Sequence, residues 1–128
     1  MEADNTSPSG KRIDLSRLQA LSGGDMAFEL KYISSFLSLI QTELNRIETA
    51  VAQNDGKLLC ETLHRIKPQL DFYRISGALN AVKNAENLLT EDYIISAGVQ
   101  TMVDFIFKEI IFACAEFEIV KNNYGQLL

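Results

Sequence analysis

The only histidine in the chain, His64, is the first residue to consider for chemistry. Lys67 follows three residues later, a spacing that brings two side chains to neighbouring positions on a helix. A neutral imidazole nitrogen is a nucleophile and a general base, and a nearby ammonium can pair with an anionic group. A lone surface histidine is more often simply solvated, so the pair indicates chemistry only if the surrounding elements support it.

Other kinds of catalytic site find no support in the sequence. The chain has no glycine-rich phosphate loop, no Gly-x-Ser-x-Gly and no His-Glu-x-x-His motif. Glu61 and His64 form one copy of the Glu-x-x-His motif of di-metal bundles, but such sites need two copies, which a single histidine forbids. We therefore expect a protein that is not an enzyme and that has no cofactor of its own.

Hydrophobic residues recur three or four positions apart along most of the chain, which is the period of amphipathic helices. The sequence predicts helices over 13–21, 26–53, 56–74, 76–89 and 96–122, with Asp25 and Ser76 as N-caps and Gly23-Gly24 and Asn54-Asp55-Gly56 as breaks. The expected inward-facing stripe of the second helix is Met26, Leu30, Ile33, Leu37, Ile40, Leu44, Ile47 and Val51.

The remaining helices carry similar stripes. They are Leu59, Leu63, Ile66, Leu70 and Tyr73, then Leu79, Val82, Ala85 and Leu89, then Val99, Val103, Ile106, Ile110, Ala113, Phe117 and Val120. A second seam of Phe105, Phe112 and Ile119 should let the last helix contact more than one neighbour. The predicted fold class is all-α, an up-and-down antiparallel four-helix bundle over 12–124 with a short N-terminal helix across one end. Residues 1–11 are expected to be a flexible tail or a linker remnant.

Composition narrows the function classes. The 128 residues carry a formal net charge of −5, and 47% of them are hydrophobic. An acidic chain without a basic cluster argues against nucleic-acid binding. Since no apolar run is long enough for a membrane span and no secretory signal is present, we expect a soluble cytoplasmic protein without membrane insertion. We also expect a monomer whose two cysteines, Cys60 and Cys114, are reduced.

The helical angle places His64 on the solvent side of its helix, about 140° from the centre of the hydrophobic stripe. Glu61, His64, Pro68 and Phe72 form a ridge beside it, and Asp71 also lies off the stripe. An aromatic and a proline next to an exposed histidine are typical of a docking patch. Two placements of Phe72 stay open: an exposed anchor, slightly favoured, or a residue turned inward by a kink at Pro68.

The residues around His64 resemble the histidine phosphotransfer (HPt) domains of two-component phosphorelays. That family carries His-x-x-Lys-Gly in the middle of a long helix, and this sequence reads His64-Arg65-Ile66-Lys67-Pro68. The resemblance extends to most of the chain, through Asp14-Leu15-Ser16-Arg17-Leu18, Gly24-Asp25, Phe36-Leu37 and Asn54-Asp55. Two positions depart from the family: Pro68 replaces the glycine after the lysine, and Arg74 replaces a later glycine. We expect Pro68 to kink the helix without breaking it.

The resemblance implies a phosphorelay intermediate. His64 would accept a phosphoryl group from a receiver-domain aspartate and pass it to another receiver aspartate, with Lys67 stabilising the phosphoryl group. Glu61, Pro68, Asp71 and Phe72 would contribute to receiver docking. The Mg²⁺ would belong to the receiver, and without an ATP site the chain could not phosphorylate itself. The alternatives are a degenerate, non-phosphorylated docking module for receiver domains, supported by Pro68 and Arg74, and an enzyme or ligand-binding bundle.

Overall fold

The computed structural model describes residues 12–128, and this part of the chain is all-helical, without a β-strand. Its helices are α1 (Ser16–Ser22), α2 (Met26–Ala52), α3 (Gly56–Phe72), α4 (Ser76–Asp92) and α5 (Ala97–Leu127). The predicted all-α fold class is confirmed. The predicted tail at 1–11 lies outside the described residues.

Side-chain caps explain where three of the helices begin. Asp25, Asp55 and Ser96 each accept a hydrogen bond from the backbone N–H three residues later, which satisfies a donor that the first turn leaves free. The expectation that Ser76 caps α4 is wrong. The N-cap is Ile75, which makes no side-chain cap, and the Ser76 hydroxyl donates to the carbonyl of Arg74 instead.

The predicted hydrophobic stripes of α3 and α5 are buried, apart from the half-buried Val120. The prediction for α2 needs correction, because Met26, Leu30, Leu37 and Val51 are only half-buried. The buried residues of α2 recur mostly at spacings of three and four and include two carboxylates: Glu29, Ile33, Phe36, Ile40, Glu43, Leu44, Ile47 and Ala50. At the centre of the core, Phe36 contacts Tyr73 and Phe117, with ring centroids 5.0 and 4.9 Å away.

One of those carboxylates explains the length of the last helix. Glu29 is 4% exposed and accepts a hydrogen bond from the hydroxyl of Tyr124 at 2.7 Å and another from Ser22. A buried carboxylate needs such donors, since an unsatisfied one would be costly. The bond to Tyr124 ties the end of α5 to the start of α2, and α5 accordingly continues to Leu127 rather than ending near Asn122.

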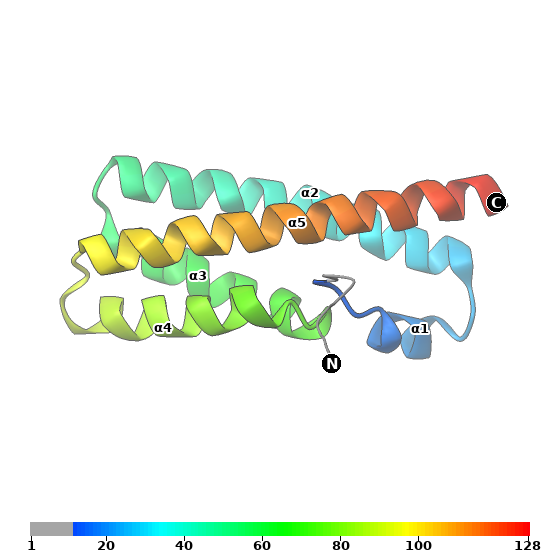
Figure 1. The fold of residues 1–128 in the computed structure, drawn as a ribbon, viewed down its shortest axis with the longest axis horizontal. Helices are drawn as coiled ribbons and strands as arrows, with labels where there is room; N and C mark the ends of the chain where they lie inside the picture. Colours follow the sequence, from blue (N-terminus) through cyan, green and yellow to red (C-terminus); the bar gives the residue numbers. More distant parts are fainter. Residues whose placement is uncertain (1–11) are drawn as a thin grey trace, which may run out of the picture.

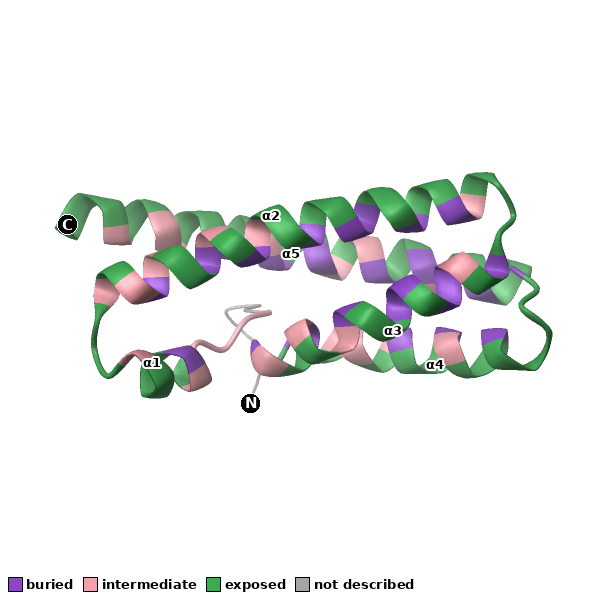
Figure 2. Cartoon of the chain, turned by 180° about the vertical axis from the view of Figure 1, so that it is seen from behind, coloured by how far each residue is buried: buried purple, intermediate pink, exposed green. Residues whose placement is uncertain are grey.

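The four long helices lie side by side (Figure 1). α2 packs on α3 and α5, and α4 packs on the same two helices. α5 lies in front of α3 in Figure 1 and behind it in the reversed view of Figure 2, so the two helices occupy opposite sides of the molecule. The second seam of α5 is not used in this packing: Phe105, Phe112 and Ile119 are exposed, which corrects the expectation that they contact a neighbouring helix.

α1 lies at the end of the molecule where α3 passes into α4 (Figure 1). The backbone N–H of Asp14 donates to the carbonyl of Tyr73 at 2.8 Å, and the guanidinium of Arg17 donates to the backbone and the carboxylate of Asp71. Leu18 is completely buried. None of the helices in residues 12–128 is both long and apolar enough for a transmembrane segment.

Candidate functional site

His64 lies in the middle of α3 and its side chain is 70% exposed, as its helical angle predicts. Leu63 and Ile66, the residues of the hydrophobic stripe nearest to His64 in the sequence, are buried. The helix therefore packs on the core with one side, while the imidazole projects from the other. α3 is continuous through Pro68. Proline has no N–H to donate to the carbonyl of His64, and the packing of Leu63, Ile66 and Leu70 holds the helix together across this gap.

The imidazole of His64 is held by Glu86, a residue of α4 that the sequence pattern did not single out. Nδ1 of His64 lies 2.7 Å from Oε2 of Glu86. The ammonium of Lys67 lies 2.6 Å from the other carboxylate oxygen, Oε1. One carboxylate therefore joins the two residues expected to do the chemistry, and its side chain is only 14% exposed.

The charge state of Glu86 decides which imidazole nitrogen is available. Partial burial alone would raise the pKa of Glu86, but hydrogen bonds from Lys67 and His64 outweigh it, and the net pKa is lowered. An ionised carboxylate only accepts hydrogen bonds. Nδ1 of a neutral His64 must therefore carry the proton and donate it to Glu86, which leaves the lone pair on Nε2.

This arrangement is suited to nucleophilic attack by Nε2. The imidazole is fixed in one tautomer, and the ring gains positive charge when Nε2 forms a bond. Glu86 stabilises that charge, as a carboxylate does behind a catalytic histidine in a hydrolase triad. The ammonium of Lys67 pairs with Glu86 in this structure. Its predicted contact with a phosphoryl group stays a prediction.

A second polar cluster flanks the site on the α2 side. Glu43 is 3% exposed and accepts hydrogen bonds from Arg65, at 3.2 to 3.3 Å, and from Arg46, at 3.3 Å. Arg65 follows His64 directly in α3. This cluster ties α3 to α2, just as Glu86 ties it to α4, so the backbone at His64 is held from both neighbouring helices.

The four predicted docking residues differ in their surroundings. Glu61 and Pro68 are exposed. Asp71 is exposed too, but its carboxylate pairs with Arg17 of α1 at 3.1 Å. Phe72 is half-buried, packs against the core and makes an edge contact with Tyr73 at 4.9 Å between ring centroids. It thus lies between the two placements left open by the sequence.

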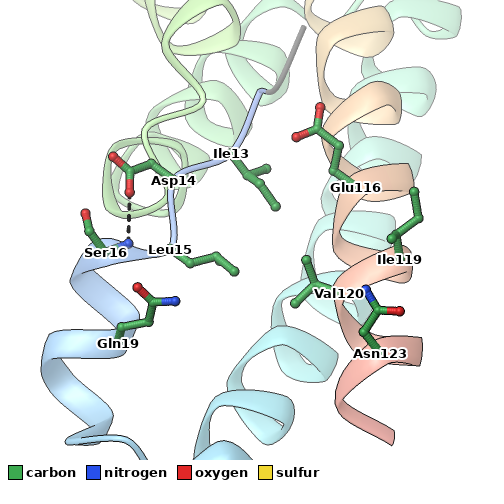
Figure 3. Close-up of a pocket in the computed structure, with 9 residues that line it drawn as sticks. All are labelled: Ile13, Asp14, Leu15, Ser16, Gln19, Glu116, Ile119, Val120 and Asn123. Carbon is green, nitrogen blue, oxygen red and sulfur yellow. Dashed lines mark hydrogen bonds between the residues drawn. The ribbon is translucent and has the colours of Figure 1, made fainter. Parts of the chain in front are cut away.

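A separate hollow lies between α1 and the C-terminal half of α5 (Figure 3). Leu15 points toward Val120 across it, and Asp14 and Glu116 contribute its carboxylates. Both carboxylates already accept backbone hydrogen bonds, Asp14 from Ser16 at 2.8 Å and Glu116 from Arg12 at 2.8 and 2.9 Å. The hollow is lined by residues of the α1 region and α5, so His64 has no part in it.

In residues 12–128, no three His, Cys, Asp or Glu side chains are grouped as metal ligands would be. Comparison with known proteins gave no match to a family model, to a curated protein or to a solved structure. The geometry around His64 is therefore the basis for assigning a function.

Proposed function

We propose that this protein is a phosphorelay intermediate that carries a phosphoryl group on Nε2 of His64. The observation that supports this most strongly is the exposed imidazole whose Nδ1 is bonded to Glu86 at 2.7 Å. A histidine held in this way presents a single nucleophilic nitrogen to solvent, where a partner protein can reach it. An exposed histidine without such a carboxylate would have no fixed tautomer.

We expect the transfer to proceed as follows. Nε2 attacks the phosphorus of an aspartyl phosphate on the partner, the Nε2–P bond forms, and the P–O bond to the aspartate breaks, releasing its carboxylate. The positive charge left on the imidazole ring is stabilised by Glu86 through Nδ1–H. The reverse reaction, with the carboxylate of a second aspartate as nucleophile, returns the neutral imidazole. Little more than positioning and charge neutralisation is needed for such a step.

The partners in this proposal are receiver domains of response regulators or hybrid histidine kinases, and their aspartate brings its own Mg²⁺. The exposed ridge of Glu61, His64 and Pro68 would contact them. We interpret the side-by-side helices as an up-and-down antiparallel four-helix bundle. In this bundle α3 carries the exposed His64, and α2 and α4 pack against α3. The two cysteines are unbonded, which fits a reducing compartment such as the cytoplasm.

The proposal is tested with a phosphorylated receiver domain carrying labelled phosphate. The chain should acquire a label that is lost in acid and kept in base, as expected for a phosphoramidate bond. His64→Gln should fold normally and acquire none, because it removes the nucleophile from an exposed position. If the label is absent from the native chain while the receiver still binds, the alternative of a non-phosphorylated docking module is correct.

A further inference from the structure

The exposed side of α5 carries large apolar side chains that the fold does not use. Phe105, Phe112 and Ile119 recur seven residues apart and are 46%, 44% and 61% exposed, and Ile111 beside them is 57% exposed. We call these four residues the α5 stripe. Single exposed apolar residues are ordinary on a protein surface, but four on one helix form a contiguous patch, which is typical of an interaction site.

The stripe faces away from the phosphoryl site. Lys108 and Ala115 lie among its residues, about 180° around α5 from the buried residues Ile106 and Phe117. α5 and α3 occupy opposite sides of the molecule (Figures 1 and 2). A partner on the stripe would therefore leave His64 accessible, and this surface goes beyond the proposed phosphoryl transfer.

Spacing indicates what kind of element would cover the stripe. Apolar residues seven positions apart form a seam on which a second helix can pack, with the small Ala115 between Phe112 and Ile119 and Lys108 at the equivalent position between Phe105 and Phe112. At its C-terminal end the stripe reaches the hollow beside α1, since Ile119 lines both. A large apolar side chain of the partner helix can insert there.

Charge indicates the chemistry of that helix. Asp104 and Glu118 flank the stripe on one side, are exposed, and make no hydrogen bond or ion pair within residues 12–128. Glu109 and Glu116 flank it on the other side, but both are already bonded to Arg12. The unpaired carboxylates Asp104 and Glu118 are complementary to lysine or arginine on the facing helix.

The chain itself shows how a basic side chain binds here. The guanidinium of Arg12 lies 4.7 Å above the ring of Phe112, and its Nε lies 3.4 Å from the carboxylate of Glu109. Cation–π contact with an aromatic of the stripe is combined with an ion pair to its acidic flank. The same two contacts are open to a partner at Phe105 and Asp104.

A second copy of this chain is a poor occupant. In an antiparallel pairing about Phe112, Asp104 of one copy would lie near Glu118 of the other, and Glu109 near Glu116. A parallel pairing would bring Asp104 near Glu109 of the other copy. Like charges at these positions oppose association.

We propose that the α5 stripe is a docking surface for a basic amphipathic helix of a partner protein. The probe is a synthetic helical peptide of about six turns, with leucines on one face and lysines and arginines beside them. Its control carries glutamates in place of the basic residues. The full-length chain should bind the basic peptide and not the acidic one, as measured by fluorescence anisotropy.

Variants then locate the site. Phe105→Ser with Ile119→Ser should weaken peptide binding at least about tenfold. The matched control Leu39→Ser, at a 41% exposed position of α2, should leave it unchanged. Asp104→Lys with Glu118→Lys should reverse the preference toward the acidic peptide. Both double variants should still accept phosphate on His64, which separates this test from that of the proposed function.

Four results would overturn the proposal. Equal binding of both peptides would show a non-specific interaction, and equal loss in the Leu39→Ser control would place the site elsewhere. Binding only after removal of residues 2–11 would make the chain's own N-terminal segment the occupant. A dimer in sedimentation analysis that Phe105→Ser with Ile119→Ser dissolves would make a second copy the occupant.

Discussion

In the proposed reaction, Glu86 orients the exposed His64 as a nucleophile. Its two oxygens accept hydrogen bonds from His64 and Lys67 at 2.7 and 2.6 Å. Glu86→Ala should lower the rate of phosphoryl transfer to His64 by about 10²- to 10³-fold, because the tautomer and the charge behind the ring are both lost. Glu86→Gln should cost less, since its amide oxygen still accepts from Nδ1–H. Single-turnover transfer from a phosphorylated receiver measures both variants.

A matched control for Glu86 is Glu91, which is exposed on the same helix and makes no hydrogen bond or ion pair within the described residues. Glu91→Ala should transfer at the native rate. Equal rates for Glu86→Ala and the native protein would mean that the carboxylate only packs against His64 and has no role in the reaction.

Phe72 is predicted to serve both the fold and the partner. It is half-buried and packs against Tyr73, so Phe72→Ala should lower the free energy of unfolding by about 2 kcal/mol, less than the 3 to 5 kcal/mol typical of a fully buried phenylalanine. Its exposed edge should also contribute to receiver binding. Denaturant melts and a receiver titration on the same variant separate the two effects. Unchanged binding would remove Phe72 from the docking surface.

At the level of the helices, the joint between α3 and α4 holds avoidable strain. Arg74 has a φ of 52°, in the left-handed region that favours glycine. Its ion pair with Asp14 is 3.7 Å long and solvent-exposed, so it contributes little. Arg74→Gly should therefore stabilise the protein by about 0.5 to 1 kcal/mol, as measured by denaturant unfolding.

Asn54 provides the comparison for that prediction. It has a φ of 54° at the joint between α2 and α3, but asparagine tolerates this region better than arginine does. Asn54→Gly should consequently gain less than Arg74→Gly. A loss of stability in Arg74→Gly would show that the ion pair with Asp14 outweighs the backbone strain.

The helices also show what the sequence could predict. The period of the apolar residues was sufficient for the stripes of α3 and α5 and for the exposure of His64. It failed for half of the α2 stripe, because the pattern of apolar residues does not include the buried Glu29 and Glu43, whose burial Tyr124 and Arg65 compensate. Glu86 was missed because its partner lies 22 residues away on another helix. The one feature of the sequence that could have indicated Glu86 is its position next to Ala85, at the edge of the hydrophobic stripe of α4.

For the whole molecule, the network at Glu86 predicts a pH dependence of stability. Because its pKa is lowered in the folded protein, Glu86 contributes stability that is fully present above its unfolded pKa and is lost as the pH falls through the folded value. The native protein should have a higher free energy of unfolding than Glu86→Gln near neutral pH, and this difference should disappear as the pH drops below about 4.5. Thermal unfolding of both proteins between neutral and acidic pH measures this. A difference that stays constant with pH would mean that Glu86 is not coupled to its partners.

In the proposed function, opposite faces of the molecule have different tasks. α3 would present the nucleophile, α2 and α4 contact its helix through Glu43 and Glu86, and α5 carries the apolar stripe on the other side. Arg65 and Lys67 are both engaged in ion pairs with these neighbouring helices. Binding on one face thus need not obstruct transfer on the other.

Whether Nε2 of His64 carries the phosphoryl group can be measured by phosphorus–nitrogen correlation NMR on the ¹⁵N-labelled protein after phosphorylation by a receiver. We expect one phosphorus signal coupled to Nε2 of His64, with Nδ1 still protonated toward Glu86. A phosphorus coupled to Nδ1, a phosphate on another residue, or no phosphorylated species at all would contradict this expectation.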